Sequence, residues 1–210
     1  LYVRSSLERA NESRREMEAV NVKLLKQSET DQMTGLANRY RLNAYSEKVL
    51  DYCYEHRLPL AMEILDIDFF KQYNDNYGHQ QGDECIIAIA NELKKMEDGQ
   101  TFCARYGGDE FIIIYAGISA EEVHAKAGAL RQNIMNLKLE HLYSKALPIV
   151  TISQGISYGV PEEGNRSWDF LHTADMLLYQ VKKKSRNDIC IADIRGQELD
   201  LSSKQEKVEP

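Results

Sequence analysis

A pair of glycines between two short apolar runs constrains the fold of this chain more than any other feature. The runs are Thr101–Arg105 and Phe111–Tyr115, and Gly107 and Gly108 lie in the short connection between them. This pattern predicts a β-hairpin, because glycine adopts the positive φ angles that tight turns require. At least two neighbouring strands are then antiparallel, so a purely parallel, doubly wound sheet fits the chain poorly.

Predicted strands and helices alternate along the rest of the globular part. Residues 78–82 begin and end with glycine and are interpreted as a loop. The predicted fold class is α+β, with a mixed, mostly antiparallel central sheet of about five strands surrounded by helices. Further strands are expected at 60–67, at 149–153 paired with 155–160, and at 189–191. Helices are expected over 38–56, 69–77, 83–96, 120–139 and 168–184.

The two ends of the chain differ from its middle. Residues 1–30 contain no glycine or proline, are dense in charged side chains, and predict one long polar helix. Two interpretations stay open: a solvated linker helix, or a parallel coiled coil that joins two copies and arrives from an upstream sensory domain. Residues 31–191 have a globular composition, and we expect the polar tail 192–210 to be disordered. A seven-residue apolar pattern slightly favours the coiled coil: Val3, Leu7, Ala10, Met17 and Leu24.

Charge and cysteine content exclude several classes of protein. Acidic residues outnumber basic ones 33 to 26, which argues against a protein that coats nucleic acid or anionic lipid. No apolar run is long enough for a membrane span, and no signal peptide opens the chain. This fragment is therefore expected to make no membrane contact, either by itself or as the cytoplasmic part of a larger, membrane-anchored bacterial sensor. The four cysteines are widely spaced and form no C-x-x-C pair, which suits a reducing cytoplasm.

Two acidic clusters are the candidate cation site. Asp66 and Asp68 end the predicted strand 60–67, where residues two apart point to the same face. Asp109 and Glu110 follow the glycines of the hairpin. If the hairpin pairs beside the first strand, Asp109 and Asp66 are placed to share one or two Mg²⁺ ions, which proteins hold with carboxylates plus substrate phosphates. The alternatives are a strand that ends in solvated acids and a hairpin with an acidic tip.

Residues between and after these clusters are able to bind a nucleotide. A helix that begins after Asp68 offers free N–H groups to an anion, with Lys71 in its first turn. Asn74 and Asp83 carry groups that pair with a base edge, and a carboxylate suits the two donors of guanine better than the acceptor of adenine. Residues 182–186 are the one dense basic stretch, which is either a helix end favoured by cations or a ligand site.

Together these motifs resemble the GGDEF family of diguanylate cyclases over residues 31–191. Residues 105–111 (RYGGDEF) carry the family signature in full, and residues 31–39 (DQMTGLANR) are similar to its opening motif, with Met33 in place of Leu. The D-x-D-x-F-K…N-D…G-H…G-D pattern is present between Asp66 and Asp83. The closing motif spans residues 174–187, with Ser185 in place of Gly.

The resemblance implies a ferredoxin-like sheet, similar to the palm of nucleotidyl cyclases, and the condensation of two GTP into cyclic di-3′,5′-GMP plus two pyrophosphates. Each subunit of a homodimer would hold one GTP, with the two sites facing each other and the N-terminal helices in contact. The family's R-x-x-D product-inhibition motif is absent, because residues 98–101 read DGQT. Tight feedback by the product is therefore not expected at this position.

The resemblance also implies a role for each site residue. Mg²⁺, as two ions per site or replaced by Mn²⁺, would be held by Asp66, the carbonyl group of Ile67, and Asp109. Glu110 would be a further ligand or a base, and a catalytic role falls to Asp109, Glu110 and Lys71. Asn74 and Asp83 would contact the guanine of GTP. The triphosphate would be held by Lys71, Lys182, Arg186 and the backbone amides of Phe69 and Phe70. His79 is a further residue expected to contact GTP. The alternatives are a catalytically silent GTP-binding or partner-binding module and a purely structural dimerisation fragment.

Overall fold

The computed structural model describes residues 14–15 and 29–199. The linker helix or coiled coil expected over residues 1–30 therefore lies outside the described residues, apart from 14–15 and 29–30. The last residues of the expected tail, 200–210, lie outside them as well. None of the helices in the described part is long and apolar enough to cross a membrane.

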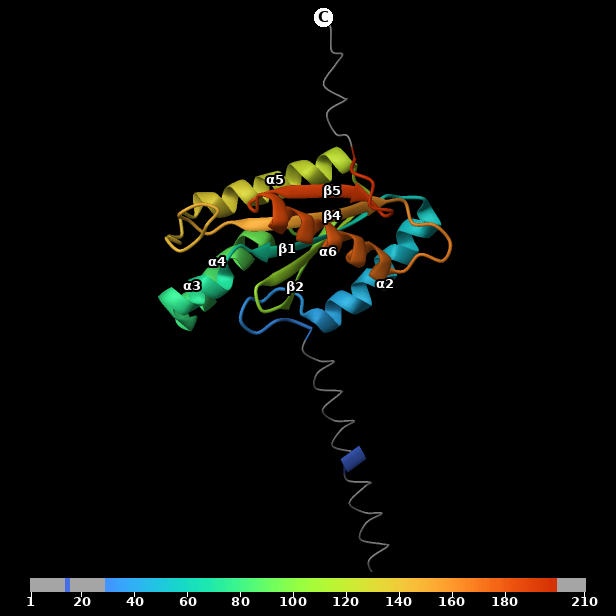
Figure 1. The fold of residues 1–210 in the computed structure, drawn as a ribbon. Coiled ribbons are helices and arrows are strands. Elements are labelled where there is room, and N and C mark those ends of the chain that lie inside the picture. Colours follow the sequence, from blue (N-terminus) through green and yellow to red (C-terminus); the bar gives the residue numbers. More distant parts are fainter. Residues whose placement is uncertain (1–13, 16–28, 200–210) are drawn as a thin grey trace, which may run out of the picture.

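Five strands form one sheet in the order β2-β3-β1-β4-β5 (Figure 1). Neighbouring strands are antiparallel except β4 and β5, which are parallel. This arrangement confirms the α+β prediction with its mixed, mostly antiparallel sheet. The strands are β1 (Leu60–Ile67), β2 (Thr101–Gly107), β3 (Glu110–Ala116), β4 (Ile152–Gly159) and β5 (Ile189–Asp193).

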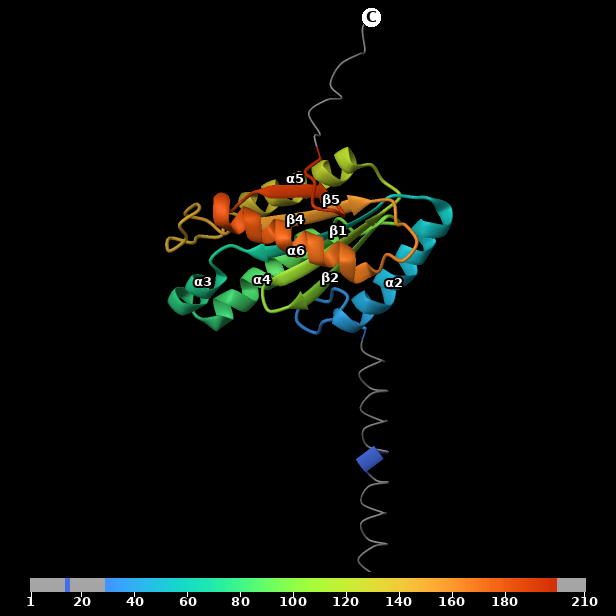
Figure 2. The same ribbon diagram turned by 45° about the vertical axis from the view of Figure 1, so that its right-hand side comes forward.

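Helices cover both faces of this sheet, as Figures 1 and 2 show. The helices are α2 (Arg39–His56), α3 (Phe70–Tyr77), α4 (His79–Lys94), α5 (Ala120–Asn136) and α6 (Ser167–Lys184). On one face, α4 and α5 pack against Leu65 and Ile67 of β1. On the other face, α2 packs against Leu60 and Met62 of β1, and α6 lies beside it over β1 and β4. Because both faces are covered, β1 is apolar along nearly its whole length.

Two sequence interpretations were wrong. Residues 78–82 are not a loop, because α4 begins at His79 directly after Gly78, whose φ of 87° alone separates α3 from α4. The strand pair expected at 149–153 and 155–160 is a single strand, β4. Gln154, the residue left between the two expected strands, lies in mid-strand with its side chain buried against Glu63. The sheet therefore contains one hairpin, β2–β3, in place of the two expected.

The chain is folded beyond residue 192, where the disordered tail was expected to begin. β5 continues to Asp193, and Ala192 is fully buried. Residues 197–199 then fold back on the strand, since the backbone N–H of Asp193 donates to Gln197 (2.9 Å) and that of Leu199 donates to Ile191 (3.2 Å). The globular unit thus includes residues that the sequence interpretation assigned to a disordered tail.

The close contact between β4 and α6 depends on Gly155. A Cβ atom on Gly155 would overlap the backbone carbonyl of Ala174 and the backbone N of Leu178, and neither backbone group moves easily. We expect Gly155→Ala to lower the free energy of unfolding by about 1–3 kcal/mol, the range of overpacked cores.

Gly128→Ala is the matched control for this substitution. Gly128 lies inside α5, where a Cβ would meet only Ile189 Cδ1 at 4.0 Å. Because alanine favours a helix over glycine by about 1 kcal/mol, this variant should be unchanged or more stable. Urea denaturation of both variants checks the pair, and equal stability of Gly155→Ala and the parent chain would contradict the packing account.

Candidate active site

The end of β1 and the tip of the hairpin meet, as the cation-site hypothesis required. Asp66 of β1 lies directly opposite Glu110, the first residue of β3, in the antiparallel ladder. Asp109 precedes Glu110 in the turn that follows Gly107 and Gly108. Asp66 is buried, whereas Asp109 and Glu110 are half-buried. Three carboxylates from distant parts of the sequence therefore share one rim of the sheet.

Lys182 of α6 is the cation that faces this acidic cluster. Its Nζ lies 2.7 Å from Oδ2 of Asp66. Burial, with smaller contributions from the charges of Asp109 and Glu110, raises the pKa of Asp66 to about 6 against the lowering effect of Lys182. Burial also raises the pKa of Glu110, which Lys182 again opposes. A single ammonium group thus leaves the carboxylates incompletely neutralised, and a further cation would be favoured here.

The donor set fits a hard divalent cation whose coordination is completed by a ligand. Among the described residues, no three His, Cys, Asp or Glu side chains are arranged to hold a metal ion by themselves. Mg²⁺ is commonly held by one or two carboxylates together with substrate phosphates, so this arrangement suits magnesium better than a closed metal centre. Ile67, whose carbonyl group was the third predicted ligand, is the last residue of β1 and is buried next to Asp66.

Asp68 follows Asp66 in the same motif but was not among the predicted metal ligands, and it has other partners. Asp68 lies beyond the end of β1 and is fully buried. Its Oδ1 accepts from Oγ of Ser153 (2.6 Å), and its Oδ2 accepts from Oγ1 of Thr151 (2.8 Å) and from the backbone N of Asn187 (2.9 Å). The role of Asp68 is therefore to join the β1–α3 turn to β4 and to the α6–β5 turn.

Part of the predicted phosphate-binding set lies around Asp68. Arg186, just after α6, lies 3.5 Å from Oδ1 of Asp68, and its guanidinium group lies 4.2 Å from the ring centre of Phe69. Phe69 precedes α3 and has a φ of 57°, with no side-chain cap at the helix start. The first N–H groups of α3, from Phe70 onward, therefore lack helical partners, and Lys71 is exposed in the same turn.

A buried histidine that the sequence analysis did not single out holds this turn. His141 is fully buried, and its Nε2 lies 3.1 Å from the carbonyl oxygen of Phe69. The rings of Tyr73 and Tyr77 approach the imidazole edge-on, and burial lowers the pKa of His141. A neutral imidazole with hydrogen on Nε2 donates to this carbonyl and supports the left-handed backbone at Phe69. A lone histidine in a loop carries no sequence signal for such a role.

The predicted base-reading residues lie on two neighbouring helices. Asn74 of α3 points at α4, where its Oδ1 fills the space that a side chain on Gly82 would occupy. This oxygen is buried and has no hydrogen-bond partner among the described residues. Asp83, the next residue of α4, is exposed, as is His79 in the first turn. Asn74 thus lies against Gly82, the residue before Asp83, and within the described part of the chain no contact of His79 shows a role.

The opening motif supports the signature hairpin. Arg105 donates from Nη2 to the carbonyl oxygen of Gly108 (2.8 Å) and from Nη1 to Oδ1 of Asp31 (3.2 Å). Asp31 in turn accepts from the backbone N and from Oγ1 of Thr34. Asp31 and Arg105 therefore position the turn that carries Asp109, a role that the motifs alone did not reveal.

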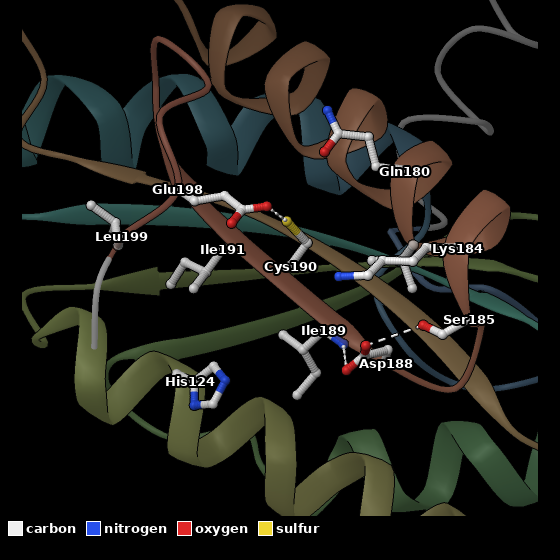
Figure 3. Close-up of a pocket in the computed structure, with 11 residues that line it drawn as sticks. His124, Gln180, Lys184, Ser185, Asp188, Ile189, Cys190, Ile191, Glu198 and Leu199 are labelled. Carbon is white, nitrogen blue, oxygen red and sulfur yellow. Dashed lines mark hydrogen bonds between the residues drawn. The ribbon is translucent and has the colours of Figure 1, made fainter. Parts of the chain in front are cut away.

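A separate pocket of about 280 Å³ lies between α5, α6 and β5 and contains none of the predicted site residues (Figure 3). Two pairs of its polar side chains bond to each other: Ser185 to Asp188 at 3.1 Å, and Cys190 to Glu198 at 3.6 Å. The rim that carries Asp66 is the better candidate site, because there a carboxyl group with a raised pKa, a lysine and open backbone groups converge.

Glu63, in the middle of β1, is a second carboxyl group with a strongly raised pKa, but it is sealed in the core. Burial raises its pKa from 4.5 to about 7, opposed by hydrogen bonds from Gln154 (2.6 Å) and Tyr115 (2.8 Å). The folded state thus keeps a proton that the unfolded chain releases near pH 4.5. The stability that this proton contributes is complete below pH 4.5 and is lost as the pH rises towards 7.

We therefore expect the free energy of unfolding to fall more steeply between pH 5 and 8 in the parent chain than in Glu63→Gln, which cannot ionise. Denaturant titrations at several pH values measure both slopes. Other titrating groups, Asp66 included, are common to the two proteins and cancel in the difference. If the free energy of unfolding changed with pH in parallel for the two proteins, the raised pKa of Glu63 would be contradicted.

Comparison with known proteins leads to the family that the sequence motifs resemble. The sequence profile described as "Diguanylate cyclase, GGDEF domain" matches residues 28–188. The probable diguanylate cyclase DgcC of Escherichia coli K12 is 35% identical over 163 residues, which are 76% of this chain and 42% of DgcC. The diguanylate cyclase DgcP of Pseudomonas aeruginosa is 33% identical over 190 residues, which are 89% of this chain and 28% of DgcP. The chain thus spans less than half the length of these two relatives.

A solved structure shows the same fold. The coiled coil and GGDEF domain of DgcB from Caulobacter crescentus, in complex with c-di-GMP, matches with a TM-score of 0.72 and 25% identity. The match covers 91% of this chain and 100% of that one. Since the family profile also covers most of the sequence, the chain belongs to the diguanylate cyclase GGDEF-domain family.

Proposed function

We propose that this chain is the catalytic part of a diguanylate cyclase, which condenses two GTP into cyclic di-3′,5′-GMP and releases two pyrophosphates. The observation that carries the proposal is the convergence of Asp66, Asp109 and Glu110 beside Lys182, at the edge where the turn before α3 is open to an anion. The diguanylate cyclases among its relatives support the same activity.

The chain would hold GTP by both ends of the nucleotide, the guanine base and the triphosphate. Asn74 and Asp83 would pair with guanine, whose N1–H and N2–H₂ donors suit a carboxylate, whereas adenine would leave Asp83 unmatched. The triphosphate would lie against the amides of Phe69 and Phe70, with Lys71, Lys182 and Arg186 as its cations. Because Arg186 stacks on Phe69 and pairs with Asp68, its position is set before the nucleotide arrives.

Asp66, the carbonyl group of Ile67 and Asp109 would hold magnesium together with the GTP phosphates, as two ions that manganese would replace. The bound metal would neutralise charge on the α-phosphate and lower the pKa of the attacking 3′-hydroxyl group. Glu110 would accept the hydroxyl proton, since burial raises its pKa and makes it a stronger base than an ordinary glutamate. Lys71 would stabilise the negative charge on the departing pyrophosphate.

The condensation needs two such chains. The described residues form one acidic cluster with one pair of base-reading residues, so two copies would face each other with one GTP each. The N-terminal helix would bring them together under an upstream sensory domain, and the cytoplasm would supply GTP and magnesium. Feedback through residues 98–101 is not expected, since Asp98 is engaged by Lys126 (2.8 Å) and no arginine is present there.

The direct test is incubation of the chain with GTP and Mg²⁺, followed by chromatography for cyclic di-GMP. We expect product from GTP and none from ATP, and Asp109→Asn should lower the rate by roughly a hundredfold or more because charge stabilisation at the α-phosphate is lost. Asp51→Asn, an exposed position on α2, is the matched control and should retain the full rate.

Two results would contradict the proposal. One is turnover of GTP that Asp109→Asn leaves unchanged, which would place the chemistry elsewhere. The other is GTP binding without product at any protein concentration, which would favour a silent regulatory module. Binding is read independently as a thermal shift in millimolar GTP.

A further inference from the structure

Large side chains form an exposed row along α6. Trp168, Met176 and Tyr179 are 59%, 51% and 58% exposed. His172 stacks on Trp168, with ring centres 4.7 Å apart and planes inclined by 8°. Spacings of four, four and three residues place all four on one side of the helix. We refer to these four residues as the α6 stripe.

The α6 stripe borders the candidate active site. A pocket of about 290 Å³ is lined by Trp168 and His172 together with Glu110 and Asp175. A second pocket, of about 230 Å³, is lined by Met176 and Tyr179, again with Glu110 and Asp175. The hollowed surface is therefore continuous from the stripe to the acidic cluster. Large exposed side chains grouped on one side of a helix point to an interaction site, whereas single exposed apolar residues are ordinary.

We propose that the α6 stripe is the surface on which a second copy of this chain docks when the two active sites face each other. The inference rests on the proposed function, in which each chain brings one GTP and the site is incomplete without its partner. A second chain must then approach the face where Glu110 and Lys182 lie. Lys182 belongs to α6, and the α6 stripe is the adjoining surface of that helix.

The chemistry of the stripe suits such a contact. Tryptophan and tyrosine contribute much of the binding energy in protein interfaces, because they bury a large area at a low cost in conformational entropy. Asp175 is exposed beside the stripe, and Nζ of Lys183 lies 4.5 Å from the ring centre of Tyr179. Opposite charges along one surface allow it to be complementary to itself, as a two-fold interface requires.

Trp168 allows a direct test, because it is the only tryptophan in the chain. Its fluorescence reports the burial of the stripe while sedimentation measures dimerisation. We expect the emission maximum to shift to the blue as protein concentration rises, over the range in which the chain becomes a dimer and the rate per chain increases. The measurement is made with Mg²⁺, with and without a non-hydrolysable GTP analogue.

Met176→Asp places a charge in the stripe and leaves the reporter and the catalytic residues intact. We expect it to raise the protein concentration at half-maximal rate per chain by about tenfold or more, with the same limiting rate at high concentration. Tyr52→Asp is the matched control, since Tyr52 is 49% exposed on α2, outside the stripe. This variant should behave as the parent chain does.

Several outcomes would overturn the inference. They are constant Trp168 emission while the chain dimerises, a chain that stays monomeric, and a spectral shift caused by the nucleotide in the monomer. Loss of activity in Met176→Asp at every concentration would also overturn it. A dimer formed through the stripe that yields no cyclic di-GMP would instead refute the proposed function and leave the interface standing.

Discussion

The buried carboxylate of Asp68 is the constraint on which the candidate site depends. Its two oxygens accept from Ser153, Thr151 and the backbone N of Asn187, and Arg186 lies 3.5 Å away. A buried carboxylate is costly unless hydrogen bonds satisfy it, so these partners have little freedom to move. The network fixes the end of β1 relative to β4 and to the turn after α6. Asp66 and Lys182 are positioned as a consequence.

The same network explains why phosphate-binding and cation-binding groups are adjacent. Phe69 leaves the strand in a left-handed conformation, with its carbonyl group held by His141 and its ring covered by Arg186. The open start of α3 is therefore next to the carboxylate of Asp66. This edge carries the carboxylate of Asp66 together with the cationic side chains of Lys182 and Arg186, and a metal-bound nucleotide requires groups of both signs. The net charge of the chain, -7, does not show this arrangement. Local placement of charge, and not its sum, determines what the site is able to bind.

Sequence reasoning succeeded where a short-range pattern determines the structure. The glycines of the hairpin predicted the β2–β3 turn correctly. The sequence placed Asp66 near Asp109 on the condition that the hairpin pairs beside β1, and the structure meets that condition. It failed at Gly78–Gly82, where one residue with positive φ was enough to separate two helices. It also failed at Gln154, because a buried polar side chain inside a strand depends on Glu63, a partner 91 residues away.

The positioning residues were beyond prediction for the same reason. Asp68 was grouped with Asp66 because residues two apart on a strand point to one face, yet its partners come from β4 and the turn after α6. The contacts of His141 with Phe69 and of Asp31 with Arg105 also join segments more than 70 residues apart in sequence. A single sequence does not reveal such pairs.

The most direct test of the account is anomalous diffraction from Mn²⁺ in crystals of the chain with a non-hydrolysable GTP analogue. We predict manganese peaks within coordination distance of the carboxylates of Asp66 and Asp109, with the base between Asn74 and Asp83 and the phosphates at the start of α3. Manganese or nucleotide bound elsewhere, for example in the pocket between α5, α6 and β5, with the Asp66 rim empty, would contradict the central claim.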